Sequence, residues 1–74
     1  MVKIILTNHA KYRRLERGID THQVKKIIKN GSIVKISSDG TIVVKGLSDG
    51  GKFIEVVYFK NGNNLVIKTA YYEG

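Results

Sequence analysis

The sequence predicts an α+β domain with the element order β-α-α-β-β-β-β, in which two N-terminal helices pack on one face of a mostly antiparallel, twisted sheet. Two observations predict this class. Helical spacing and helix-capping residues occupy the chain up to Gly31, whereas a two-residue alternation begins at Ser32. Turn signals separate the alternating segments. We expect residues 1–74 to form a single domain, because a chain of this length supports one core.

The first two expected elements are a short strand and a polar helix. Val2–Leu6 is rich in β-branched residues and predicts a buried strand. Asn8–Ile19 predicts a helix that Thr7 or Asn8 caps and Gly18 stops, because glycine readily adopts the left-handed conformation that ends a helix. Few of its side chains are apolar, so this helix has little to bury.

The second expected helix has a conventional amphipathic pattern. Asp20 and Gln23 are spaced as a capping box, and Gly31 ends the segment. Its apolar stripe, at positions i, i+3 and i+4, consists of Val24, Ile27 and Ile28. This is the helix that we expect to pack on the sheet.

The later strands are expected within residues 32–37, 41–46, 52–59 and 65–72. Asp39-Gly40 and Asn61-Gly62 are typical of tight turns, and residues 46–51 form a glycine-rich loop. If Asn61 and Gly62 are the two loop residues, one register follows. On the side that the helices cover, Ile54, Val56 and Tyr58 then face Thr69, Ile67 and Leu65. On the other side, Glu55 faces Lys68 and Phe53 faces Ala70.

Charge is the strongest compositional feature. Thirteen Lys and Arg residues against six Asp and Glu residues give a net charge of +7 and favour a polyanionic partner, RNA or another nucleic acid first. The alternative is a basic protein in which charge serves solubility alone. The absence of cysteine fits a reducing, cytoplasmic setting, and no segment approaches the ~18 apolar residues that span a bilayer. We therefore expect no membrane partner; abundant lysine and isoleucine favour a thermophilic source.

Two kinds of site are excluded from the motifs. Residues 46–53 match G-x-x-x-x-G-K, but Phe53 stands where a phosphate loop needs Ser or Thr, and a strand rather than a helix is expected there. His9 and His22 lie on different expected helices, with no cysteine or carboxylate cluster to complete a metal site. We therefore expect no metal and no cofactor.

A row of ionisable side chains on the first expected helix is the candidate catalytic site. His9, Arg13 and Arg17 recur at i, i+4 and i+8 and so share one helical face. Histidine can move a proton near neutral pH, and the guanidinium group binds phosphate in a fixed fork. The alternative is structural, with Glu16 and Asp20 pairing with the arginines.

Further basic and aromatic side chains are candidates for binding nucleic acid. They are Lys11, Arg14, Lys25, Lys26, Lys29 and Tyr72. The lysines would provide a positive field for a phosphate backbone, and the tyrosine could stack on a base. The alternative is a solvated helix face and an aromatic residue that packs at the end of the sheet.

The segment HAKYRRLERGI resembles a family of small bacterial and archaeal domains of unknown function whose signature is H-A-x-x-R-x-x-E-R-G-I. The matching positions are His9, Ala10, Arg13, Glu16, Arg17, Gly18 and Ile19. The second expected helix and the last strand, LVIKTAYY, are similar to that family at the level of pattern. The family in turn resembles the RelE-like ribonuclease toxins, a group with barnase-like and colicin-type nucleases.

This resemblance implies an open sheet face that cradles RNA and a metal-independent endoribonuclease. It also implies that His9 is the base or acid, that Arg13 and Arg17 clamp phosphate, and that Lys68 is an electrostatic partner on a strand. The expected protein partner is an acidic antitoxin-like protein. The alternative is a non-catalytic module, either nucleic-acid-binding or protein-interacting and possible as a homodimer, in which the helix side chains are structural.

Overall fold

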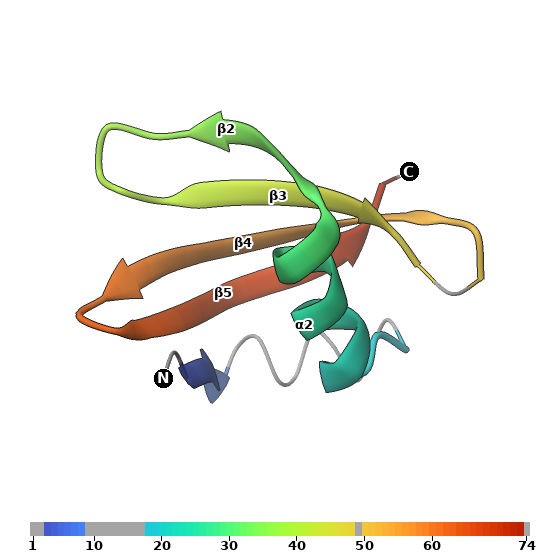
Figure 1. Cartoon of the computed structure of the whole chain (residues 1–74), viewed down its shortest axis with the longest axis horizontal. Coiled ribbons are helices and arrows are strands. Elements are labelled where there is room, and N and C mark those ends of the chain that lie inside the picture. The colour runs from blue at the N-terminus through green and yellow to red at the C-terminus, as the bar shows by residue number, and fades with distance from the viewer. Residues whose placement is uncertain (1–2, 9–17, 49, 74) are drawn as a thin grey trace.

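Five strands form one mixed sheet, and a helix lies across one of its faces (Figure 1). The computed structural model describes residues 3–8, 18–48 and 50–73. In chain order the elements are β1 (Lys3–Leu6), α2 (Thr21–Asn30), β2 (Ser32–Ile36), β3 (Ile42–Leu47), β4 (Phe53–Asn61) and β5 (Asn64–Tyr72). Within the described ranges no helix is long and apolar enough to cross a membrane.

The spatial order of the strands is β1-β5-β4-β3-β2, so the first two strands of the chain lie at opposite edges. Strands β2 to β5 form a meander of antiparallel hairpins. Strand β1 instead pairs in parallel with β5, from Lys3 opposite Asn64 to Leu6 opposite Ile67. The helix α2 contacts β3 and β4.

The predicted order β-α-α-β-β-β-β, with two helices on one face of the sheet, is wrong for the described chain, which runs β-α-β-β-β-β. Most of the first expected helix, residues 9–17, lies outside the described residues. The sheet is mixed because β1 enters it beside the last strand. A short β-branched run suits either strand direction, so Val2–Leu6 carried no signal for a parallel neighbour.

The helix α2 confirms the second expected helix. At its start, a carboxylate oxygen of Asp20 accepts a hydrogen bond from the Gln23 backbone N–H at 2.8 Å. At its end, the backbone N–H of Gly31 donates to the Ile27 carbonyl at 2.7 Å. The side chains of Val24 and Ile27, on the side of α2 that faces the sheet, are fully buried, as the apolar stripe predicts.

Replacing Asp20 with alanine is expected to lower the free energy of unfolding by about 1 kcal/mol, because the Gln23 N–H loses its acceptor. Asp20→Asn keeps an acceptor oxygen at the cap and should restore most of that loss. Urea denaturation followed by circular dichroism measures both variants. Equal losses in the two variants would contradict a role for the cap.

The β4–β5 hairpin differs from its predicted register. Its two loop residues are Gly62 and Asn63, because Asn61 pairs with Asn64, and Gly62 has a positive φ of 63°. The pairing also shifts between Val57 and Tyr58. Tyr58 is opposite Ile67 and Val57 is opposite Thr69, so Lys68 is the extra residue of a β-bulge.

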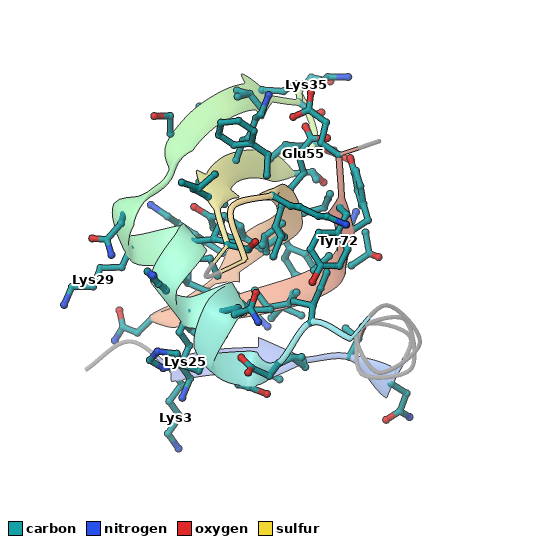
Figure 2. All side chains as sticks on the ribbon, turned by 90° about the vertical axis from the view of Figure 1, so that its right-hand side faces the viewer. Lys3, Lys25, Lys29, Lys35, Glu55 and Tyr72 are labelled. Carbon is teal, nitrogen blue, oxygen red and sulfur yellow. The ribbon has the colours of Figure 1, made fainter. Side chains whose placement is uncertain are left out.

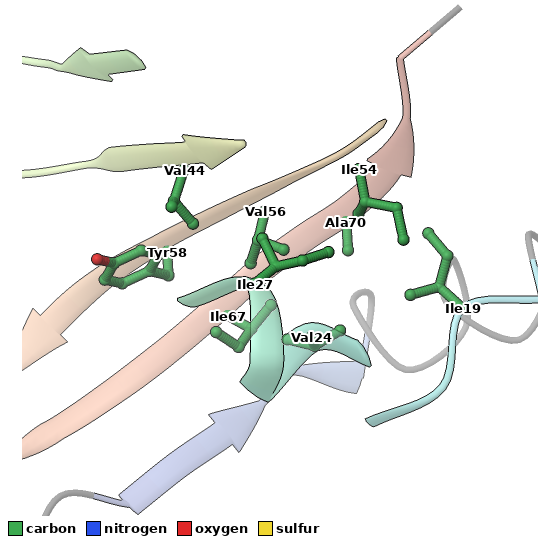
Figure 3. Close-up of a cluster of buried hydrophobic side chains, with 9 residues drawn as sticks. All are labelled: Ile19, Val24, Ile27, Val44, Ile54, Val56, Tyr58, Ile67 and Ala70. Carbon is green, nitrogen blue, oxygen red and sulfur yellow. The ribbon is translucent and has the colours of Figure 1, made fainter. Parts of the chain in front are cut away.

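This bulge changes which side chains of β5 point toward α2. Ala70, rather than the predicted Thr69, joins the core on that side. The buried apolar side chains, shown in Figure 3, are Ile19, Val24, Ile27, Val44, Ile54, Val56, Tyr58, Ile67 and Ala70. Tyr72 packs against this cluster from the end of β5.

The predicted pairing of Glu55 with Lys68 is also wrong. Glu55 lies opposite Tyr71 on β5 and opposite Lys45 on β3. The loop and bulge positions cause this difference, because each moves the register by a residue or more. Lys68 is therefore not neutralised by Glu55.

A hairpin loop joins β3 to β4 as the sequence predicts, but it begins later than residue 46, because Gly46 and Leu47 belong to β3. The backbone N–H of Ser48 donates to the Lys52 carbonyl at 2.7 Å, and the Lys52 N–H donates to Ser48 Oγ at 3.1 Å. Gly51 adopts a positive φ of 82°, which suits glycine. These bonds fix Lys52 and Phe53 at the end of the sheet.

Candidate nucleic-acid interface

One face of the sheet carries no helix in the described part of the chain. We call it the open face. Strand alternation and register assign to it Ile5, Val43, Lys45, Leu47, Phe53, Glu55, Val57, Phe59, Val66, Lys68, Thr69 and Tyr71. The open face thus combines apolar and aromatic side chains with lysines.

Lys68 lies at the bulge and is exposed. Its ammonium group is 5.7 Å from the centroid of the Phe59 ring and donates a hydrogen bond to Thr41 Oγ1 at 3.1 Å. A cation over an aromatic face is attracted by the ring quadrupole. Lys68 forms no ion pair with any of the described carboxylates, so its charge is available to an anion.

Asp39, in the β2–β3 turn, lies close to this arrangement. Its carboxylate accepts from the Thr41 backbone N–H at 3.0 Å. The hydrogen bonds from the Thr41 backbone and side chain lower the pKa of Asp39 below its ordinary value, and the positive charge of Lys68 lowers it further. Asp39 therefore stays ionised and holds the turn beside Lys68.

Because the folded state lowers the pKa of Asp39, its charged form stabilises the fold above the pKa of an unfolded aspartate. That contribution is lost as the pH falls through the lowered pKa. Asp39→Ala is expected to lower the urea midpoint at neutral pH, and its difference from wild type should shrink as the pH falls through the lowered pKa of Asp39. Asp39→Asn, which keeps an acceptor for Thr41, should lose less. A difference that is constant with pH would contradict this account.

A second set of lysine–aromatic contacts lies at the other end of β4. Lys45 Nζ is 4.8 Å from the Phe53 ring centroid and forms an ion pair with Glu73. Lys52 Nζ is 5.9 Å from the Tyr72 ring centroid. A shallow hollow joins these side chains; it is lined by Lys45, Gly51, Lys52, Phe53, Tyr72 and Glu73. Lysines therefore lie beside aromatic rings at both ends of β4, and the Phe53 ring is exposed.

The predicted helix lysines lie on the other side of the molecule. Lys25, Lys26 and Lys29 line a shallow surface on α2 together with His22 and Asn30. Figure 2 shows Lys25 and Lys29 on the helix side and Glu55 on the opposite side of the sheet. These lysines therefore do not share a surface with Lys68.

The structure places the remaining candidates as follows. His9, Lys11, Arg13, Arg14 and Arg17 lie outside the described residues. Lys68 is on the open face. Tyr72 is half-buried, packs against the core cluster and has Lys52 near its ring. Among the described residues, no group of three His, Cys, Asp or Glu side chains could hold a metal ion.

Sequence reasoning missed Lys45, Lys52, Phe53 and Phe59 as members of a site. Phe53 and Phe59 share the odd-numbered side of β4, which the alternation alone indicated. The lysine above each ring comes from another strand, however, and depends on the register. The predicted β4–β5 register is wrong by two residues at Tyr58, and the sequence predicts no register for β3 and β4, so neither contact follows from the sequence.

The fold is that of a known ribonuclease toxin. The structure is similar to the crystal structure of BrnT, the Brucella abortus ribonuclease toxin, with a TM-score of 0.78 over 100% of this chain and 99% of that chain. The two sequences are 14% identical, so the likeness shows a shared fold. The chain belongs to the family described as Domain of unknown function (DUF4258), which it matches over residues 6–72. No curated protein matches it significantly.

Proposed function

We propose that this protein is an RNA-directed, toxin-type domain whose open face binds single-stranded RNA. One observation carries the proposal: at both ends of the open face of β4 an ammonium group lies over an aromatic ring, the exposed Phe53 and the half-buried Phe59. Proteins that bind single strands combine a positive surface with rings on which bases stack. The net charge of +7 and the fold shared with a ribonuclease toxin support the same function.

The spacing of the rings suits a strand of several nucleotides. Phe53 and Phe59 are six residues apart on β4, which corresponds to about 20 Å. Bases stack on these rings. Lys68 on the open face, and Lys52 in the hollow that Phe53 also lines at the end of the sheet, then contact the neighbouring phosphates. The lysines of α2 face away from this surface and add only to the overall positive field.

The proposed reaction is metal-independent cleavage of RNA. A base removes the 2′-OH proton, the 2′-oxygen attacks the adjacent phosphorus, and the bond to the 5′-oxygen breaks as an acid protonates that oxygen. The products carry a 2′,3′-cyclic phosphate and a 5′-OH. His9 moves a proton, Arg13 and Arg17 hold the phosphate, and Lys68 stabilises its developing charge.

Cleavage of end-labelled RNA in the presence of EDTA tests this function. Wild type should give fragments with 2′,3′-cyclic phosphate ends, and His9→Ala should lower the rate by about a hundredfold or more. Lys68→Ala should also slow cleavage, whereas Lys29→Ala, a matched loss of an exposed lysine on α2 at the other side of the sheet, should have little effect. RNA binding without cleavage by wild type would contradict catalysis and leave a non-catalytic RNA-binding module.

A basic toxin-type domain also needs a partner that controls it. We propose an acidic antitoxin-like protein, because a net charge of +7 favours association with a negatively charged chain. Sedimentation at micromolar concentration separates this complex from a homodimer of the basic chain.

A further inference from the structure

The helix α2 covers only part of its side of the sheet. In Figure 1 the β2–β3 and β4–β5 hairpins extend past the helix. Two isoleucines of β2 remain exposed there, Ile33 at 56% and Ile36 at 66%. Ile42 and Leu65, on β3 and β5, are only partly buried. We call Ile33, Ile36, Ile42 and Leu65 the apolar shelf.

The pairing of the strands connects the three isoleucines of the shelf to the core, and Leu65 packs against the same core from β5. Ile33 lies opposite the buried Val44, and Ile36 lies opposite Ile42. Ile42 in turn lies opposite the buried Tyr58. The shelf therefore continues the hydrophobic core outward. A continuous apolar surface of this kind marks an interaction site more often than scattered exposed side chains do.

Positive charge lies near the shelf. Lys60 is opposite Leu65 at the end of β4, and α2, past which the hairpins extend, carries Lys25 and Lys29 on its surface. All three are exposed and form no ion pair with any described carboxylate. The carboxylate of Asp39, in the neighbouring turn, accepts a hydrogen bond from Thr41 and lies near Lys68, and it forms no ion pair with these three lysines. The three lysines therefore favour a negatively charged partner.

The shape of the shelf favours a helix over a strand. The pairing of β2 shifts between Ile33 and Lys35, so Val34 forms a bulge that interrupts the ladder of the free edge. The shelf also crosses β2, β3 and β5 instead of following one strand. A second helix could lie beside α2 at the usual interaxial distance of about 8–10 Å. A second copy of this chain would bring another +7 against the lysines.

We propose that the apolar shelf docks an acidic amphipathic helix of a partner protein. The apolar stripe of that helix packs on Ile33, Ile36 and Leu65, and its carboxylates face Lys25, Lys29 and Lys60. This surface lies on the opposite side of the sheet from the open face. The inference rests on the proposed function only for the expectation of an acidic partner.

A synthetic peptide tests the proposal. The probe is a fluorescein-labelled, end-capped helix with leucine at i, i+3, i+4 and i+7 and glutamate elsewhere, and the full chain is titrated into it. A scrambled peptide of the same composition lacks the stripe. Wild type should bind the amphipathic peptide at least about tenfold more tightly than the scrambled one. Ile36→Glu should weaken that binding by a similar factor.

Leu47→Glu is the matched control, since Leu47 is 53% exposed but lies at the other end of β3. It should leave peptide affinity unchanged. Equal binding of both peptides, or equal effects of the two variants, would overturn the proposal. Self-association that Ile36→Glu abolishes would assign the shelf to a second copy instead. RNA affinity is measured in parallel: a variant that loses the peptide but keeps RNA separates this inference from the RNA-binding function.

Discussion

Replacing Gly31 with alanine is expected to lower the free energy of unfolding by about 2–3 kcal/mol. Gly31 lies where α2 ends and the chain meets β3. A Cβ atom there would be 2.5 Å from the Ile27 carbonyl oxygen and 2.6 Å from the Lys45 carbonyl oxygen. Both atoms belong to the backbone, so no side-chain rotation relieves the contact. The helix must move away from the core that it covers.

The backbone conformation of Gly31 allows the effect of the new contacts to be measured without backbone strain. Its φ of −78° and ψ of 176° are accessible to alanine, so any loss comes from the contacts and not from backbone strain. Gly50→Ala is the matched control, because its nearest neighbour would be Ser48 Oγ at 3.9 Å. Urea denaturation should show a loss in Gly31→Ala only. Equal midpoints for the two variants would contradict the packing of α2 on β3.

Replacing both Phe53 and Phe59 with alanine is expected to weaken RNA binding by at least about a hundredfold. Stacking of one base on an aromatic ring contributes about 1–3 kcal/mol, and the two rings lie far enough apart to take separate bases. Phe53 is 48% exposed and offers its surface directly. Each single variant should lose about half of the binding free energy that the double variant loses.

Fluorescence anisotropy of a labelled single-stranded RNA measures these affinities. Ile36→Ala is the control, because it removes an exposed apolar side chain from the opposite side of the sheet. Its affinity should match that of wild type, and circular dichroism should confirm that every variant is folded. A double variant that binds RNA as wild type does would exclude stacking on the open face.

The sequence predicted the elements that depend on local signals. Asp20, the apolar stripe of α2 and Gly31 define a helix through neighbouring residues, and that helix forms as expected. The side of β4 that carries Ile54, Val56 and Tyr58 follows from alternation and is the buried side. Both kinds of pattern extend over only a few residues, so predictions from them stay correct when another part of the chain is predicted wrongly.

The failures concern features that local patterns do not encode. Asn61-Gly62 and Gly62-Asn63 are equally plausible loops by composition, and only the full ladder chooses between them. The bulge at Lys68 has no sequence mark, yet it brings Ala70 into the core and places Glu55 opposite Tyr71. The parallel position of β1 likewise depends on its distant neighbour β5. The lysine–aromatic contacts of the open face also depend on the register between strands, because each joins residues of two strands.

The salt dependence of RNA affinity tests the central claim, that the open face is the RNA surface, most directly. The comparison uses wild type, Lys52→Ala/Lys68→Ala and the matched pair Lys25→Ala/Lys29→Ala on α2. Each lost phosphate contact to a single strand lowers the slope of log K against log salt by about 0.7. The account predicts a slope about 1.4 smaller for the first pair and an unchanged slope for the second. A smaller slope for the α2 pair alone would contradict it and assign RNA to the helix side.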